Sequence, residues 1–232
     1  MIGEISAIAL AAILAITLHE AAHGYAALAL GDDTAWRLGR VSLNPLRHVD
    51  PVGTLLLPGL LLVTQLATIG RVEAMFGWAK PVPVDFGRLH NPRWGMVLVA
   101  AAGPGINFAL AFGFGMAAHV ATGGAGLLPG PAMDWLLRFI ALSMLYNVIL
   151  ACFNLLPIPP LDGGRILVGI LPLPAARAVA GLERYGLLIV IGLVFVLPYL
   201  VPGFDPLRTL LREVALPVLE AVFWLSGHGG AQ

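Results

Sequence analysis

The chain has 232 residues, of which 59% are hydrophobic and 11% are charged, and its formal net charge is zero. A soluble domain usually carries about 25% charged and about 45–50% apolar residues, so this composition excludes an ordinary soluble protein and predicts an integral membrane protein. The balanced charge gives no basic surface for nucleic acid, and the single cysteine, Cys152, excludes an internal disulfide and a cysteine-rich metal site.

Six stretches approach the roughly 20 apolar residues that a membrane-spanning helix needs. They cover residues 5–30, 52–70, 94–122, 133–156, 185–201 and 206–225, and the last is the weakest. The pattern predicts an all-α polytopic membrane protein with about five to six membrane segments.

The charges of the loops predict the orientation of the chain. Residues 31–51 contain three arginines and residues 71–93 contain three arginines and Lys80, whereas residues 121–132 contain neither arginine nor lysine. By the positive-inside rule the first two loops face the cytoplasm and the third faces outside. Because two successive cytoplasmic loops conflict with a full crossing, the segment 52–70 is expected to re-enter, with Pro58-Gly59 breaking its helix.

Residues 79–84 are expected to form a short extended edge strand.

The first apolar stretch contains His19-Glu20-Ala21-Ala22-His23. Residues four apart lie on one face of a helix, so both imidazoles can reach one ion at about 2.0–2.1 Å. Glu20 is then placed beside the metal, where it can take a proton from a water molecule. The alternative, polar groups that only link helices, is disfavoured because ionisable side chains at membrane depth are costly. The sequence predicts His19 and His23 as zinc ligands and Glu20 as the general base.

A catalytic zinc site needs a third protein ligand. Asp162 follows a proline-rich run after the fourth apolar stretch, and Gly163 and Gly164 follow it. Proline excludes a regular helix there and glycine permits tight turns, so the carboxylate is expected on irregular backbone that lines a wet cavity. Alone, Asp162 fits a helix N-cap equally well. Together with the two histidines it is predicted to be the third ligand, and Arg165 is expected at the cytoplasmic interface without a catalytic role.

These residues resemble those of the site-2 protease family of intramembrane zinc metalloproteases. The resemblance is carried by the His19–His23 motif, by Leu161-Asp162-Gly163, and by Gly103-Pro104-Gly105-Ile106-Asn107, which is similar to the family's Gly-Pro-x-x-Asn element. Asn154, eight residues before the aspartate, matches an asparagine that the family also uses. Residues 39–53 and 79–83 resemble signatures of the compact prokaryotic subgroup.

The resemblance implies a three-helix catalytic core, one Zn²⁺ per chain, and cleavage of transmembrane protein or peptide substrates in the lipid bilayer. It also implies regulated intramembrane proteolysis in a prokaryotic cell (inner) membrane, with the active site nearer the cytoplasmic side. A single domain is expected over residues 1–232, with the catalytic core at about 5–170 and C-terminal helices at about 183–226. Asn154 is expected to contact the substrate or the transition state. Asn107 fits that role and an interhelical hydrogen bond equally well.

Three other functions fit parts of the pattern: a metal transporter, a catalytically silent zinc-binding membrane protein, and a zinc hydrolase of a lipid or another non-peptide substrate. A transporter has no need of Glu20 beside two helical histidines, and a silent relative is expected to have lost a ligand or the base. The sequence does not decide against the third function, and it does not predict the oligomeric state.

Overall fold

The computed structural model describes residues 2–70, 77–123, 128–201 and 203–229, and within these ranges the chain is helical and contains no β-strand. Five helical segments are long and apolar enough to cross a membrane, namely Gly3–Ala29, Pro51–Thr68, Pro92–Gly123, Gly130–Asn154 and Leu173–Leu200. This confirms the prediction of an all-α polytopic membrane protein.

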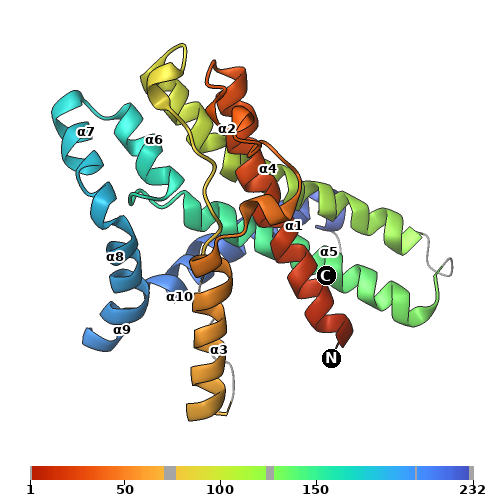
Figure 1. Cartoon of the computed structure of the whole chain (residues 1–232). Coiled ribbons are helices and arrows are strands. Elements are labelled where there is room, and N and C mark those ends of the chain that lie inside the picture. The colour runs from red at the N-terminus through yellow and green to blue at the C-terminus, as the bar shows by residue number, and fades with distance from the viewer. Residues whose placement is uncertain (1, 71–76, 124–127, 202, 230–232) are drawn as a thin grey trace.

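Three long helices form the centre of the molecule (Figure 1): α1 (Ile2–Ala29), α4 (Pro92–Gly123) and α5 (Gly130–Asn154), each packed against the other two. On α1 the buried face carries Ala7, Ala11 and Ala15, which are spaced four residues apart. Small side chains at this spacing let helix backbones approach closely, which is how helices associate where water supplies no hydrophobic driving force. The three-helix core therefore rests on close helix packing.

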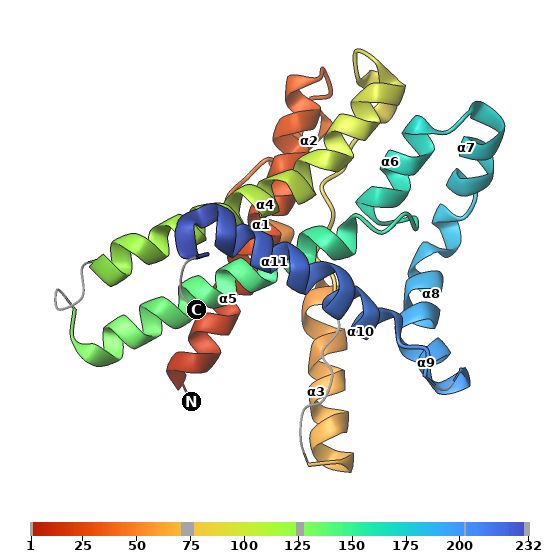
Figure 2. The same ribbon diagram turned by 180° about the vertical axis from the view of Figure 1, so that it is seen from behind.

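The chain after α5 adds two groups of shorter helices. The first group is α6 (Asp162–Ile170), α7 (Leu173–Ala180), η4 (Glu183–Tyr185), α8 (Gly186–Ile191), η5 (Gly192–Val196) and α9 (Leu197–Leu200). The second is α10 (Pro206–Leu210), η6 (Leu211–Ala215), α11 (Leu216–Phe223) and η7 (Trp224–His228). Figure 2 shows the second group crossing α4 and α5, where Leu210, Ala215 and Val222 join a buried cluster with Met144 and Val148. The sixth expected segment is therefore helical and packs across the core.

The segment 51–68 differs in one respect from its prediction. It is a helical turn, η2 (Pro51–Leu56), followed directly by α3 (Leu57–Thr68), so the predicted break at Pro58-Gly59 is wrong. Pro58 lies inside this continuous helical run and has no N–H to donate to it. The Trp78 N–H nevertheless donates to the Gly53 carbonyl at 3.1 Å, so the chain returns beside the start of this helix.

Both basic loops therefore lie at the same end of α3, as the loop charges predicted, although Arg71 falls outside the described residues. In both views α3 stands apart from the other helices (Figures 1 and 2).

The loops at that end contain α2 (Thr34–Arg37), η1 (Pro45–His48) and η3 (Phe86–Arg88). The expected strand at 79–84 is not formed in the described part of the chain, where residues 77–85 have no regular secondary structure. Pro81 and Pro83 have no N–H to give to a ladder. Instead, single backbone N–H groups bond to different elements: Lys80 to the His48 carbonyl, Val82 to Glu20 and Asp85 to Asp32.

Candidate metal centre

The histidine pair lies in the C-terminal half of α1 and faces the core. His19 and His23 are one helical turn apart, and only 4% and 8% of their surfaces are exposed. They face α4 at Gly103, where any side chain would collide with both imidazole rings. Pro104, inside the same helix, removes the N–H that would bond to the Ala100 carbonyl and so loosens α4 at this level. The motif Gly103-Pro104 therefore makes room for two rings between tightly packed helices.

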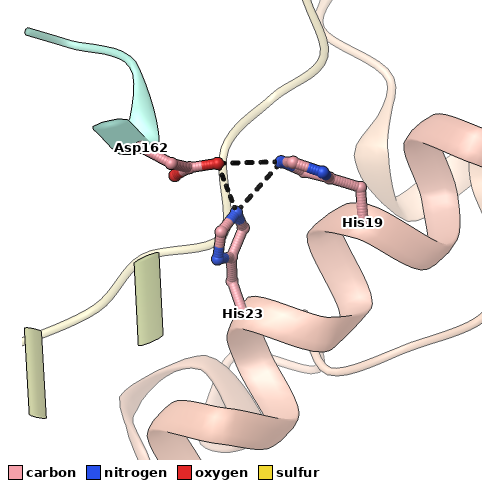
Figure 3. A group of neighbouring side chains, drawn as sticks. All are labelled: His19, His23 and Asp162. Carbon is pink, nitrogen blue, oxygen red and sulfur yellow. Dashed lines mark hydrogen bonds and ion pairs between the residues drawn. The ribbon is translucent and has the colours of Figure 1, made fainter. Parts of the chain in front are cut away.

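Asp162 reaches the histidines from the opposite side, as Figure 3 shows. It is the first residue of α6, the N-cap position belongs to Leu161, and no side chain there makes a capping hydrogen bond. Gly163 and Gly164 press against the backbone of residues 155–159, where a Cβ atom at either position would collide. The turn before α6 is thus folded tightly enough to direct the Asp162 carboxylate at α1, and the geometry favours the ligand interpretation over the N-cap.

The other end of α6 is held by α4. The guanidinium of Arg93 donates to the carbonyls of Gly169, Ile170 and Leu171, the last at 2.7 Å. These carbonyls have no partner within the helix, and a cation at a helix C-terminus is favourable. Arg93 therefore fixes the position of α6 relative to α4, and with it the position of Asp162.

The three candidate ligand atoms form a nearly equilateral triangle. The His19 Nε2 and His23 Nε2 atoms are 3.1 Å apart, and Asp162 Oδ2 lies 3.2 Å from the first and 3.3 Å from the second. Two ligands at about 2.0–2.1 Å from a tetrahedral ion are about 3.3 Å from each other. The described residues hold this one group of three ligand side chains, and its spacing fits zinc.

The hydrogen bonds behind the rings determine which nitrogens face the centre. His23 Nδ1 lies 2.7 Å from the Val99 carbonyl, which can only accept, so Nδ1 carries the proton. His19 Nδ1 lies 2.5 Å from Asn107 Oδ1, and the Asn107 Nδ2 donates to the Ala15 carbonyl and to Asn147. Asn107 can therefore only accept from His19, and both Nε2 atoms present unprotonated lone pairs.

Two lone pairs and a carboxylate oxygen thus converge with no proton between them. Asp162 is 5% exposed, and its Oδ2 atom is buried without a hydrogen-bond partner. Buried polar atoms are rarely left unsatisfied, and an isolated buried anion is costly. A bound cation would give a partner to both histidine lone pairs and to the Asp162 oxygen. Histidines that bind a metal characteristically donate their other N–H to an oxygen acceptor, as His19 and His23 do here.

A cavity of about 470 Å³ opens beside the triangle. Glu20 and Asn154 line it together with the three ligand residues, and its other walls are mainly apolar. The Glu20 Oε2 atom accepts a hydrogen bond from the Val82 N–H at 2.9 Å. Asn154 donates to the Leu150 carbonyl of its own helix, whereas Asn107 is fully buried behind His19 and is not part of the cavity wall. Of the two asparagines, only Asn154 borders the cavity.

The sequence reasoning missed two contributors to the site. The Val82 N–H is a backbone group, and no residue type signals it. Arg165 was expected at the interface, but it lines the cavity, contacts the Phe86 ring and pairs with Glu183 at 3.2 Å. Its place three residues after Asp162, on the same face of a helix, is a signal that was available.

Helices of membrane length hold two histidines and an aspartate at the spacing of three ligands of a tetrahedral ion, next to a carboxylate and an open cavity. This arrangement defines a membrane-embedded metallohydrolase. The comparisons with known proteins narrow this class. The model of peptidase family M50 matches residues 120–197, which include Asn154 and Asp162. The "Putative zinc metalloprotease YwhC" of Bacillus subtilis (strain 168) is 38% identical over 213 residues, which cover 91% of this chain and 90% of that protein.

Two further relatives are named "Putative zinc metalloprotease Rip2". The protein of Mycolicibacterium smegmatis is 30% identical over 77% of this chain and 62% of its own length. That of Mycobacterium tuberculosis (strain H37Rv) is 33% identical over 75% of this chain and 61% of its own length. No solved structure matches the chain. The chain belongs to peptidase family M50, the site-2 protease family, and it is an integral membrane zinc metalloendopeptidase.

Proposed function

We propose that this protein hydrolyses peptide bonds within the transmembrane segments of membrane protein substrates, with His19, His23 and Asp162 holding one zinc ion and Glu20 acting as the general base. The observation that carries the proposal is the ligand triangle, with sides of 3.1–3.3 Å, built into a helix of membrane length. A peptide bond that reaches this centre has to do so at membrane depth.

The position along α1 supports a site below the membrane surface. His19 is ten residues before the end of α1 at Ala29, which corresponds to about 15 Å along the helix axis. The loops beyond this end carry the basic residues of 31–51 and 77–91, so we place it at the cytoplasmic side. The compared relatives are bacterial proteins, which supports a prokaryotic cell (inner) membrane. The active site is then nearer the cytoplasmic side.

The chemistry assigns a distinct task to each group. When bound, zinc polarises a carbonyl group and makes a coordinated water molecule more acidic. Glu20 lies on α1 directly after the first ligand and borders the cavity, so it can accept the proton of the attacking water and return it to the departing amide nitrogen. Asn154 borders the same cavity from α5 and can donate to a carbonyl oxygen of the substrate.

A substrate helix has to unwind before its backbone enters this cavity, because its amide groups are bonded within the helix. Residues 77–84 form neither helix nor strand and contribute Gly77, Trp78, Pro81 and Val82 to the cavity wall. An unwound substrate segment can lie along this wall, and the largely apolar lining suits a sequence taken from a transmembrane span. We therefore assign the protein to intramembrane proteolysis of transmembrane substrates, of the kind that releases a membrane-held segment in regulated proteolysis.

The test is cleavage of single-span membrane proteins that are co-reconstituted with the enzyme in lipid vesicles, with product termini identified by mass spectrometry. Wild type is expected to cut within the apolar span. Glu20→Gln is expected to lose cleavage while its zinc content is unchanged, and Glu213→Gln, an exposed carboxylate paired with Arg212, is the matched control. Cleavage confined to residues outside the span, or turnover by Glu20→Gln, would refute the proposal.

A further inference from the structure

The peptide unit that joins Pro81 to Val82 is held from both ends. Its N–H donates to the Glu20 Oε2 atom at 2.9 Å, and its carbonyl oxygen lies 3.4 Å from the Arg40 Nη2 atom. The same Nη2 atom donates to the preceding carbonyl, that of Lys80, at 2.7 Å. Because a peptide unit is planar and stiff, fixing its oxygen also fixes the direction of its N–H.

The Arg40 side chain is costly where it lies. Only 8% of Arg40 is exposed, its Nε atom is buried without a partner, and the ion pairs of the described residues do not include it. A buried guanidinium is normally paired with a carboxylate. Here its described partners are the two backbone carbonyls of residues 80 and 81, which lie directly before the N–H that contacts Glu20.

We propose that Arg40 is a positioning residue for the general base: it fixes the peptide unit of Pro81 and Val82, whose N–H holds one carboxylate oxygen of Glu20. The second oxygen then remains for the proton transfers. This inference rests on the proposed role of Glu20 as base. Arg40 itself does not line the cavity and has no contact with the reacting atoms.

Further hydrogen bonds hold residues 80–85 close to α1. The Lys80 N–H donates to the His48 carbonyl at 2.9 Å, and the Asp85 N–H donates to Asp32 at 2.7 Å. Gly24, one residue after the second ligand, packs close to both the loop and the segment, since a Cβ atom there would lie 3.1 Å from Val41 Cγ2 and 3.4 Å from Val82 Cγ1. Of these partners, Arg40 is the one that bonds to the two carbonyls directly before the Val82 N–H.

The guanidinium, the peptide unit and the carboxylate follow one another, with Arg40 Nη2 3.4 Å from the Pro81 oxygen and the Val82 nitrogen 2.9 Å from Glu20 Oε2. Hydrogen bonds in series polarise one another, and one to a charged acceptor is stronger than one between neutral groups. Removing the cation at one end should therefore weaken the hydrogen bond at the other. A general base must be held in its working geometry by groups that are themselves fixed. Loss of the Arg40 contacts should therefore lower kcat.

Hydrogen exchange of the Val82 amide measures this connection directly. Pro81 and Pro83 have no amide hydrogen, and a peptide loses the label of its first two residues, so a peptide of residues 79–83 reports Val82 alone. In the zinc-loaded full chain, Arg40→Met is expected to accelerate exchange at Val82 by about tenfold or more. Glu20→Ala, which removes the acceptor, is expected to do the same.

Two matched variants separate positioning from general stability. Arg40→Lys keeps a donor for the Lys80 carbonyl and is expected to restore most of the protection. Arg37→Met removes an arginine on the same loop that pairs with Asp33 at the surface, and it is expected to leave Val82 unchanged. Unaltered exchange in Arg40→Met, or faster exchange spread equally over the amides of α1, would overturn the proposal.

Kinetics on a transmembrane peptide that wild type cleaves provide the second measurement. Arg40→Met is expected to lower kcat by about tenfold at unchanged KM and unchanged zinc content. A rise in KM alone, or loss of zinc, contradicts positioning of the base. If Glu20→Gln were still active, the proposed function would fail, whereas the exchange experiment would still report whether Arg40 controls the Val82–Glu20 contact.

Discussion

Asn107 on α4 and His19 on α1 are joined by a hydrogen bond of 2.5 Å between Oδ1 and Nδ1. Asn107 has no exposed surface, and its amide donates to Ala15 and Asn147 on the other two core helices. One side chain thus ties the three core helices together and at the same time directs the free nitrogen of His19 toward Asp162. The packing of the bundle and the geometry of the metal centre depend on the same residue.

Replacing Asn107 by alanine should weaken zinc binding, because His19 loses the acceptor that fixes its ring and its tautomer. Loss of such a partner typically lowers metal affinity by about 10- to 100-fold. Competition with a chelator of known affinity measures the change. Asn154→Ala is the control, since Asn154 bonds only to a carbonyl of its own helix in the described residues and should keep full affinity. Equal zinc affinity in wild type and Asn107→Ala would show that this hydrogen bond does not support the metal.

Two glycines two residues apart on α4 provide a steric test of the centre. A Cβ atom at Gly103 would lie 2.5 Å from Cε1 of His23 and 2.6 Å from Cε1 of His19, whereas one at Gly105 would meet nothing within 4 Å. Gly103→Ala is expected to displace both rings and to lose zinc and cleavage. Gly105→Ala should retain both, and it should be no less stable, because alanine favours the helix by about 1 kcal/mol over glycine. Similar zinc contents in the two variants would contradict the described contact between α4 and the histidines.

Asp32, in the loop after α1, makes the stability of the protein depend on pH. Burial alone would raise its pKa, but hydrogen bonds from Thr34 and from the Asp85 N–H outweigh this and hold the pKa of Asp32 below its ordinary value of 3.8. A lowered folded-state pKa gives stability that is fully present above about pH 4 and is lost as the pH falls through the folded-state value.

Asp32→Asn should therefore lower the thermal unfolding temperature at pH 7, and the difference from wild type should narrow as the pH falls below about 4. Asp33→Asn, which breaks partly exposed ion pairs with Arg37 and Arg88, should have a smaller effect at either pH. A difference between Asp32→Asn and wild type that stays constant down to acidic pH would mean that the Asp32 charge does not contribute.

The sequence predicted the fold class and the membrane segments because their signals are local. Apolar stretches of sufficient length report membrane helices, and two histidines four residues apart report one helical face. Asp162 is farther away in the chain, but an acidic residue on a proline- and glycine-rich turn at membrane depth is unusual enough to be recognised. Its 3.2 Å approach to His19 agrees with that prediction.

The contacts made by backbone groups and by distant partners were beyond sequence reasoning. Nothing in the composition of residues 79–84 shows that Val82 donates to Glu20 or that Arg40 lies behind it. The alternation of proline and valine suggested a paired strand, but the missing N–H groups prevent a ladder. Pro58 suggested a break in the helix, yet the helix continues through it after the π-type turn Pro51–Leu56, a local geometry that residue types do not report.

Zinc content measured by elemental analysis in purified wild type and in Asp162→Ala tests the central claim most directly, with Asp134→Ala, an exposed aspartate of α5, as the control. A site of three protein ligands predicts about one zinc per chain in wild type and in the control, and clearly less in Asp162→Ala. Full zinc in Asp162→Ala would contradict the three-ligand centre, and a wild type that binds no zinc would contradict the metalloprotease account itself.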